Sequence, residues 1–125
     1  MVTGSNRPLS PHLQIYRLPL AALLSITHRI SGVVLSLGLI LLIAALFSVA
    51  GSGAFYSAIH AFLNTILGQV FLLLWLFALF LHFCHGIRHL IWDTVSAFDR
   101  STLTRHSLWE LGLAVLLTLI SWIIV

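Results

Sequence analysis

Long apolar runs separated by short polar segments dominate the pattern of this chain. The runs extend from Ile30 to Ala50, from Ile66 to about Leu90 and from Leu108 to Val125. Each is long enough to cross about 30 Å of hydrocarbon as a helix that rises about 1.5 Å per residue. We therefore predict an all-α membrane protein. It would form one membrane-anchor domain over residues 1–125, with transmembrane helices at about 21–50, 65–91 and 107–125 after a polar segment at 1–20.

The segments between the runs carry the signals that end helices. Gly51-Ser52-Gly53 is expected to terminate the first helix, and Pro19 is tolerated in its first turn. The apolar segment from Phe55 to Leu67 is too short to span a membrane, so we predict an interfacial helix there. The polar stretch from Asp93 to Arg105 indicates a short loop.

Composition supports the same class. Hydrophobic residues make up 60% of the chain and charged residues only 7%, which excludes an ordinary soluble domain of 125 residues. The single cysteine, Cys84, allows no intrachain disulfide and no thiolate-ligated iron–sulfur cluster within this chain. We expect Cys84 to be a small packing residue.

The basic residues predict the orientation. All of them lie before or at the start of the first helix, or around the segment that joins the second to the third: Arg7, Arg17, Arg29, Arg88, Arg100 and Arg105. By the positive-inside rule, the N-terminus and residues 93–106 face the cytoplasm or a mitochondrial matrix, and the C-terminus faces the other side. Because no Arg- and Ser-rich presequence precedes the first helix, a bacterial inner membrane is favoured.

Two polar clusters interrupt the apolar helices, and spacings of three, four and seven place each on one helix face. The first helix carries Ser25, His28, Arg29 and Gly32. The second carries His82, His85, Gly86 and His89. The two helices run antiparallel, so both clusters belong to the same leaflet, and we predict that they build one site.

Each cluster also has a simpler interpretation. Arg29 could extend its side chain to lipid phosphates, because the run after it spans the bilayer unaided. Arg88, His89 and Asp93 could form an ordinary cytoplasmic helix end. His82 lies about 10 Å deeper than His89, and its alternative role is a hydrogen bond to a neighbouring helix.

A buried neutral imidazole suits haem iron, for which histidine is the usual axial ligand in helical bundles. Gly86 would leave room for a flat macrocycle, and His28 and Arg29 could pair with its propionates. His82 and His85 project from one helix and cannot ligate opposite sides of a porphyrin. The second ligand is therefore expected from another polypeptide, which would make this chain half of a heterodimeric haem-binding anchor.

Three ordered motifs, together with the three-helix plan, support a resemblance that covers essentially the whole chain. They are RPLSPHLQIY at 7–16, SITHRISG at 25–32, and His82-x-x-x-Gly86-Ile-Arg-His-Leu-Ile-Trp-Asp93. With the three-helix plan, the chain resembles the cytochrome b subunits of succinate dehydrogenase, the haem-binding membrane anchors of respiratory complex II.

The resemblance implies that His82 is the axial ligand of one haem b, with His85 a neighbour, and that a small hydrophobic partner subunit supplies the other ligand. It implies that Ser25, Ile26 and Arg29 line a ubiquinone pocket and that His28 and Arg29 lie near the haem propionates. The motif at 7–16 would contact the iron–sulfur subunit.

The implied function is transfer of electrons from the iron–sulfur subunit to ubiquinone. Ser25 could donate a hydrogen bond to a quinone carbonyl, and Arg29 could stabilise its anionic reduced forms. Asp93 could relay protons or pair with Arg88, and the pairing is slightly favoured. Succinate oxidation would occur on a flavoprotein subunit, so no catalytic residue for it is expected here; membrane lipid, but no nucleic acid, is an expected partner. The alternatives are a fumarate reductase anchor and a haem-free structural anchor or small transporter.

Overall fold

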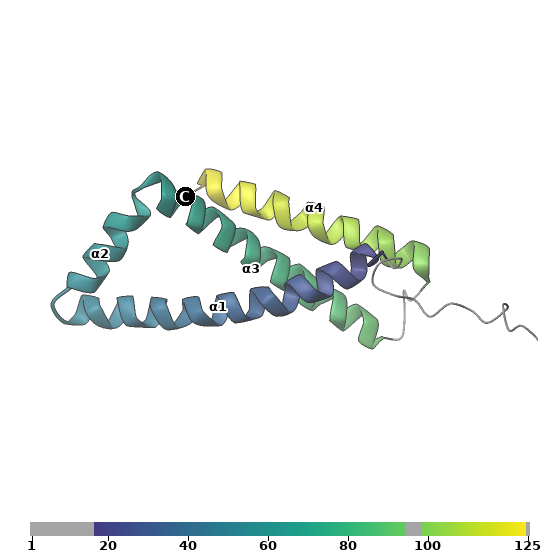
Figure 1. Cartoon of the computed structure of the whole chain (residues 1–125), viewed down its shortest axis with the longest axis horizontal. Helices are drawn as coiled ribbons and strands as arrows, with labels where there is room; N and C mark the ends of the chain where they lie inside the picture. The colour runs from purple at the N-terminus through teal and green to yellow at the C-terminus, as the bar shows by residue number, and fades with distance from the viewer. Residues whose placement is uncertain (1–16, 95–98, 125) are drawn as a thin grey trace, which may run out of the picture.

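A computed structural model describes residues 17–94 and 99–124. This part of the chain forms four helices and no strand: α1 (Leu20–Ala50), α2 (Ala54–Leu63), α3 (Ile66–Asp93) and α4 (Arg100–Ile124) (Figure 1). Three of them, α1, α3 and α4, are long and apolar enough to cross a membrane. The prediction of an all-α, multi-pass membrane protein is therefore confirmed. The motif at 7–16 lies outside the described residues.

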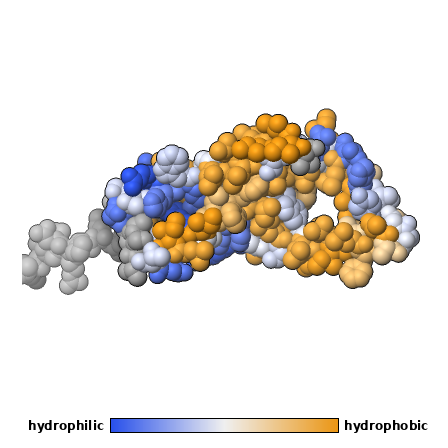
Figure 2. All heavy atoms as spheres, turned by 180° about the vertical axis from the view of Figure 1, so that it is seen from behind, coloured by the Kyte–Doolittle hydropathy of each residue, from blue (hydrophilic) through white to orange (hydrophobic). Residues whose placement is uncertain are grey.

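The surface has an apolar middle and two polar ends. Figure 2 shows hydrophobic side chains over the middle of the molecule and hydrophilic ones at both ends, with the larger group at the end where α1 begins, which we call the polar end. Large side chains on α1 are strongly exposed, including Ile40 at 63% and Phe47 at 76%. Such an apolar surface is stable only where lipid or another hydrophobic subunit covers it.

Glycine and threonine set the boundaries around α2. Gly53 precedes the helix with a φ of 68°, a left-handed conformation that favours glycine, and its N–H donates to the Ser48 carbonyl at 2.7 Å. Thr65 caps α3, because its Oγ1 accepts the Gly68 N–H at 3.0 Å. The segment predicted as an interfacial helix is thus helical as far as Leu63 and breaks before α3.

The start of α4 differs from the expectation. The helix begins at Arg100 rather than near residue 107, so the polar stretch up to Arg105 is a loop only in part. Asp99 caps the helix by accepting the Thr102 N–H at 2.9 Å, and hydrogen bonds from Ser101 and Thr102 hold the pKa of the Asp99 carboxyl below its usual range. Apolar composition located the membrane-spanning part but missed this polar first turn.

The three long helices pack most closely toward the polar end. Leu24, Leu81, Cys84 and Ala114 form a small core between α1, α3 and α4, and Cys84 is a packing residue there. Farther along, the Trp75 indole lies so close to Gly38 that a β-carbon there would fall 1.2 Å from a ring atom. Beyond this point α1 and α3 separate towards α2 (Figure 1), and apolar side chains of α1, α2 and α3 line a hollow of about 620 Å³.

Candidate haem and quinone site

The polar residues of α1 and α3 meet at the same end of the bundle. The rings of His28 and His82 stack with centroids 4.0 Å apart and an angle of 17° between their planes. The structure therefore brings together two histidines that are separated by more than fifty residues and that helix periodicity had placed in one leaflet.

His82 is held by a small hydrogen-bond network from α1. The Ser31 hydroxyl donates to the His28 carbonyl oxygen at 2.8 Å, which leaves a lone pair on Oγ free to accept a hydrogen bond from the Nδ1–H of His82 at 3.0 Å. The same Nδ1 lies 3.2 Å from the His28 carbonyl oxygen. Both neighbours accept hydrogen bonds, so they favour the tautomer with its proton on Nδ1 and leave Nε2 as a lone pair.

The surroundings of His82 fit an axial haem ligand. Nε2 has no hydrogen-bond partner among residues 17–94 and 99–124. A β-carbon at Gly32 would lie 3.1 Å from Cε1 of His82, so the absence of a side chain there lets the ring pack against α1. A β-carbon at Gly86 would meet nothing within 4 Å, which leaves open space one turn along α3. An oriented lone pair next to open space is what ligation of a flat macrocycle requires.

The residues expected around the quinone lie on a neighbouring face of α1. Ser25 is partly buried, whereas Ile26 and Arg29 are exposed. Within the described chain the Arg29 guanidinium forms no ion pair. Thus His28 turns towards α3, while Ile26 and Arg29 stay exposed within the described part of the chain.

A second polar network joins α3 to α4, and its three charged or titratable side chains are buried. Nδ1 of His85 lies 2.7 Å from Oε1 of Glu110, and Nη1 of Arg88 donates to Oε2 of the same carboxylate at 2.9 Å. Nη2 of Arg88 donates to the Leu103 carbonyl oxygen at 2.9 Å, and the guanidinium lies 4.7 Å from the Trp92 ring centroid. One carboxylate therefore serves both a histidine and an arginine inside the bundle.

This network corrects the expected pairing of Arg88 with Asp93. Arg88 is only 3% exposed and pairs with Glu110, whereas Asp93 is exposed at the end of α3. Positions 88 and 93 are five residues apart, which places them about 140° apart around a helix, so their side chains point to different faces.

Sequence reasoning missed Ser31 and Glu110. Ser31 lies three residues after His28 in the motif at 25–32. Serine is common in helices that span membranes, so its presence alone does not indicate a contact with His82. Glu110 gave a stronger signal, because it is the only acidic residue within the last apolar helix, and an ionisable residue at such a position marks a functional or pairing site by default.

Ser31→Ala should weaken haem retention without removing it. The change deletes one hydrogen bond to Nδ1 of His82, and loss of such an outer partner typically lowers metal-ligand affinity about 10- to 100-fold. The rate of haem transfer from the purified complex to apomyoglobin would measure this effect. Ser36→Ala is the matched control, because its exposed hydroxyl makes only a bond back to the Gly32 carbonyl of its own helix. Equal haem loss from both variants would contradict the role of Ser31.

The chain is similar to known proteins over most of its length. The chain matches the family model described as "Succinate dehydrogenase/Fumarate reductase transmembrane subunit" over residues 3–121. It is 44% identical to the succinate dehydrogenase cytochrome b560 subunit of Reclinomonas americana, over 95% of this chain and 86% of the relative. It is 41% identical to the succinate dehydrogenase cytochrome b556 subunit of Paracoccus denitrificans, over 74% of this chain and 71% of the relative. It is 32% identical to the cytochrome b556 subunit of Rickettsia felis, over 95% of this chain and 93% of the relative. The chain therefore belongs to the family of succinate dehydrogenase and fumarate reductase transmembrane subunits.

Proposed function

We propose that this chain is the haem-b-binding membrane anchor of succinate:quinone oxidoreductase and helps to pass electrons from the iron–sulfur subunit to ubiquinone. The observation that carries the proposal is the orientation of His82, whose Nδ1 is held by α1 while Nε2 is left without a partner in the described chain. The relatives described above are all named for succinate dehydrogenase, which favours succinate oxidation over fumarate reduction.

His82 is the proposed ligand of the iron, and bound haem b would supply a one-electron redox centre. His28 and Arg29 would hold the propionates. Nε2 of His28 is buried and has no hydrogen-bond partner in residues 17–94 and 99–124, and a carboxylate would satisfy it. Arg29, which is exposed and forms no ion pair with the described residues, can complete the same contact.

The second axial ligand would come from a second hydrophobic anchor subunit. His28 stacks beside His82 and does not face it across a gap, so it is badly placed to ligate the opposite side of a porphyrin. The exposed apolar surface of α1 is suited to packing against another set of membrane helices. The complete complex would add the iron–sulfur and flavoprotein subunits, with succinate oxidised on the flavoprotein.

The ubiquinone headgroup would bind at Ser25, Ile26 and Arg29. The Ser25 hydroxyl would donate to a quinone carbonyl, Ile26 would contact the ring, and the Arg29 charge would stabilise negative charge that develops on the oxygens. Asp93 is exposed at the same end of the bundle and can exchange protons with water. We place this end on the cytoplasmic side of a bacterial inner membrane, with the C-terminus in the periplasm, because the arginines gather there.

Arg29→Ala and Ser25→Ala test the quinone site. Loss of a hydrogen bond that involves a charged group costs about 1.5–3 kcal/mol, so Arg29→Ala should slow succinate–ubiquinone reductase activity about 10- to 100-fold. Ser25→Ala should have a smaller effect in the same direction. Electron transfer from succinate to a soluble dye that accepts electrons before the quinone should stay unchanged. Arg105→Ala, an exposed arginine on α4, is the matched control, and unaltered quinone reduction by Arg29→Ala would refute the assignment.

A further inference from the structure

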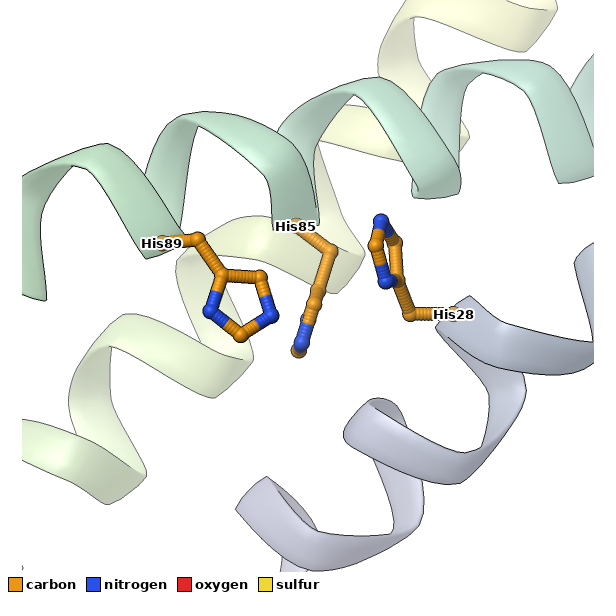
Figure 3. Close-up of side chains that lie close together, drawn as sticks. All are labelled: His28, His85 and His89. Carbon is orange, nitrogen blue, oxygen red and sulfur yellow. The ribbon is translucent and has the colours of Figure 1, made fainter. Parts of the chain in front are cut away.

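A cavity of about 370 Å³ lies between α3 and α4, apart from the proposed haem and quinone sites. Its lining includes Ile87, Arg88 and Ile91 of α3 and Trp109, Glu110 and Leu113 of α4. Figure 3 shows His28 of α1 beside His85 and His89 of α3, next to the proposed haem edge. None of these three histidines borders the cavity, so an occupant of the cavity would not compete with haem for them.

The buried part of the lining is polar. Arg88 is 3% exposed and Glu110 is 6% exposed. The two Nη atoms of Arg88 donate to Glu110 and to the Leu103 carbonyl oxygen, but its Nε is buried without a hydrogen-bond partner in residues 17–94 and 99–124. Buried N–H groups in folded proteins normally have an acceptor. Nε of Arg88 therefore indicates an acceptor that the described chain does not provide.

The outer part of the lining is apolar. Ile87, Trp109 and Leu113 are exposed around the cavity. On helices that cross a membrane such side chains contact lipid, and an indole ring favours the membrane interface. The cavity thus joins a buried N–H donor to an apolar opening towards the bilayer.

The position of Arg88 along α3 sets its depth in the membrane. The 28 residues of α3 span about 42 Å, which matches the thickness of about 40–45 Å of a bilayer with its headgroups. Arg88 lies five residues before the end of the helix at Asp93, or about 7.5 Å inside it. This is the boundary between headgroups and hydrocarbon, where ester groups join the acyl chains of a phospholipid to glycerol.

The charge of the site selects the kind of acceptor. Because Glu110 pairs with Arg88 at 2.9 Å, the positive charge that would attract a phosphate or a carboxylate is already compensated. A neutral carbonyl oxygen can still accept from Nε. We propose that this cavity binds a diacyl phospholipid of the membrane, with an ester carbonyl on Nε of Arg88 and an acyl chain along Ile87 and Leu113. The proposal requires neither haem nor quinone.

A photoreactive phosphatidylethanolamine with a diazirine in its acyl chain tests the proposal on the purified complex in detergent micelles. We expect ultraviolet light to attach it to the α4 peptide that contains Leu113. Unlabelled diester phosphatidylethanolamine should displace the probe. A diether lipid with the same headgroup and chain length should displace it about 10- to 100-fold less well, because it lacks the carbonyl that accepts from the charged donor. Equal displacement by the two lipids would overturn the proposal.

Two variants locate the lipid in this cavity. Ile87→Trp fills the space from its exposed side and should lower the labelling about tenfold, since the indole takes volume that the acyl chain needs. Leu74→Trp is the matched control, because Leu74 is exposed on the same helix but does not border the cavity. Full labelling of Ile87→Trp, or displacement of the probe by ubiquinone rather than by phospholipid, would contradict the assignment. Absence of any labelling on α4 would also overturn it and would leave an ordered water as the acceptor for Arg88.

Discussion

Replacing His82 with alanine is expected to abolish haem b binding to the complex. Ser31 and the His28 carbonyl of α1 orient Nδ1 of His82, and Nε2 of the same ring has no partner in the described chain and is left for a ligand. Alanine offers no atom that can ligate iron. The haem-to-protein ratio from the pyridine haemochrome assay should fall to near zero, and the reduced-minus-oxidised spectrum should lose its b-type bands.

His85→Asn provides the control for the identity of the ligand. The Asn side chain can still donate to Glu110 from about the position of Nδ1, so the network between α3 and α4 keeps this hydrogen bond while the imidazole is lost. This variant should retain haem. A complex in which His85→Asn loses haem and His82→Ala keeps it would show that the ligand is His85.

The sequence predicted the membrane-spanning helices well because a bilayer imposes a simple requirement on length and apolarity. The same regularity placed His28 and His82 at one level, since antiparallel helices of similar length bring the start of one beside the end of the next. The first turn of α4 escaped prediction, because Arg100 to His106 lies where polar residues are tolerated and an N-cap, not hydrophobicity, decides where the helix begins.

The choice of partners could not be predicted from one helix at a time. Three acidic residues follow Arg88 in the sequence, and the packing of α3 against α4 pairs it with Glu110 rather than with the nearer Asp93. Likewise, His28 and Arg29 are adjacent in sequence, yet the rotation of α1 turns one towards α3 and leaves the other exposed. Spacing alone had grouped them on one face, because a face inferred from three- and four-residue steps is broad compared with the direction of a single side chain.

The two polar networks differ in how much stability is lost when one partner is removed. The contacts of His82 are between neutral groups and can be lost one at a time at moderate cost. The contacts of Glu110 join a carboxylate, a guanidinium and an imidazole where neither water nor lipid can replace a missing partner. Stability of the α3–α4 pair should therefore be most sensitive to changes at Glu110.

Glu110→Leu is expected to destabilise the chain by about 3–5 kcal/mol, because it leaves the Arg88 guanidinium buried without its counter-charge. The apparent melting temperature of the detergent-solubilised complex and the yield of assembled complex should both fall. Asp93→Asn is the matched control, since it removes an exposed carboxylate and should change neither quantity.

The double variant Arg88→Met with Glu110→Leu separates charge burial from side-chain packing. Replacing both members of a buried ion pair with apolar groups of similar volume is often neutral or stabilising, so the double variant should melt well above Glu110→Leu alone. If the losses of stability from the two substitutions instead add, so that the double variant is the least stable, the broken ion pair is not the cause of the destabilisation. The loss would then come from the other bonds of these residues, to His85 and to the Leu103 carbonyl.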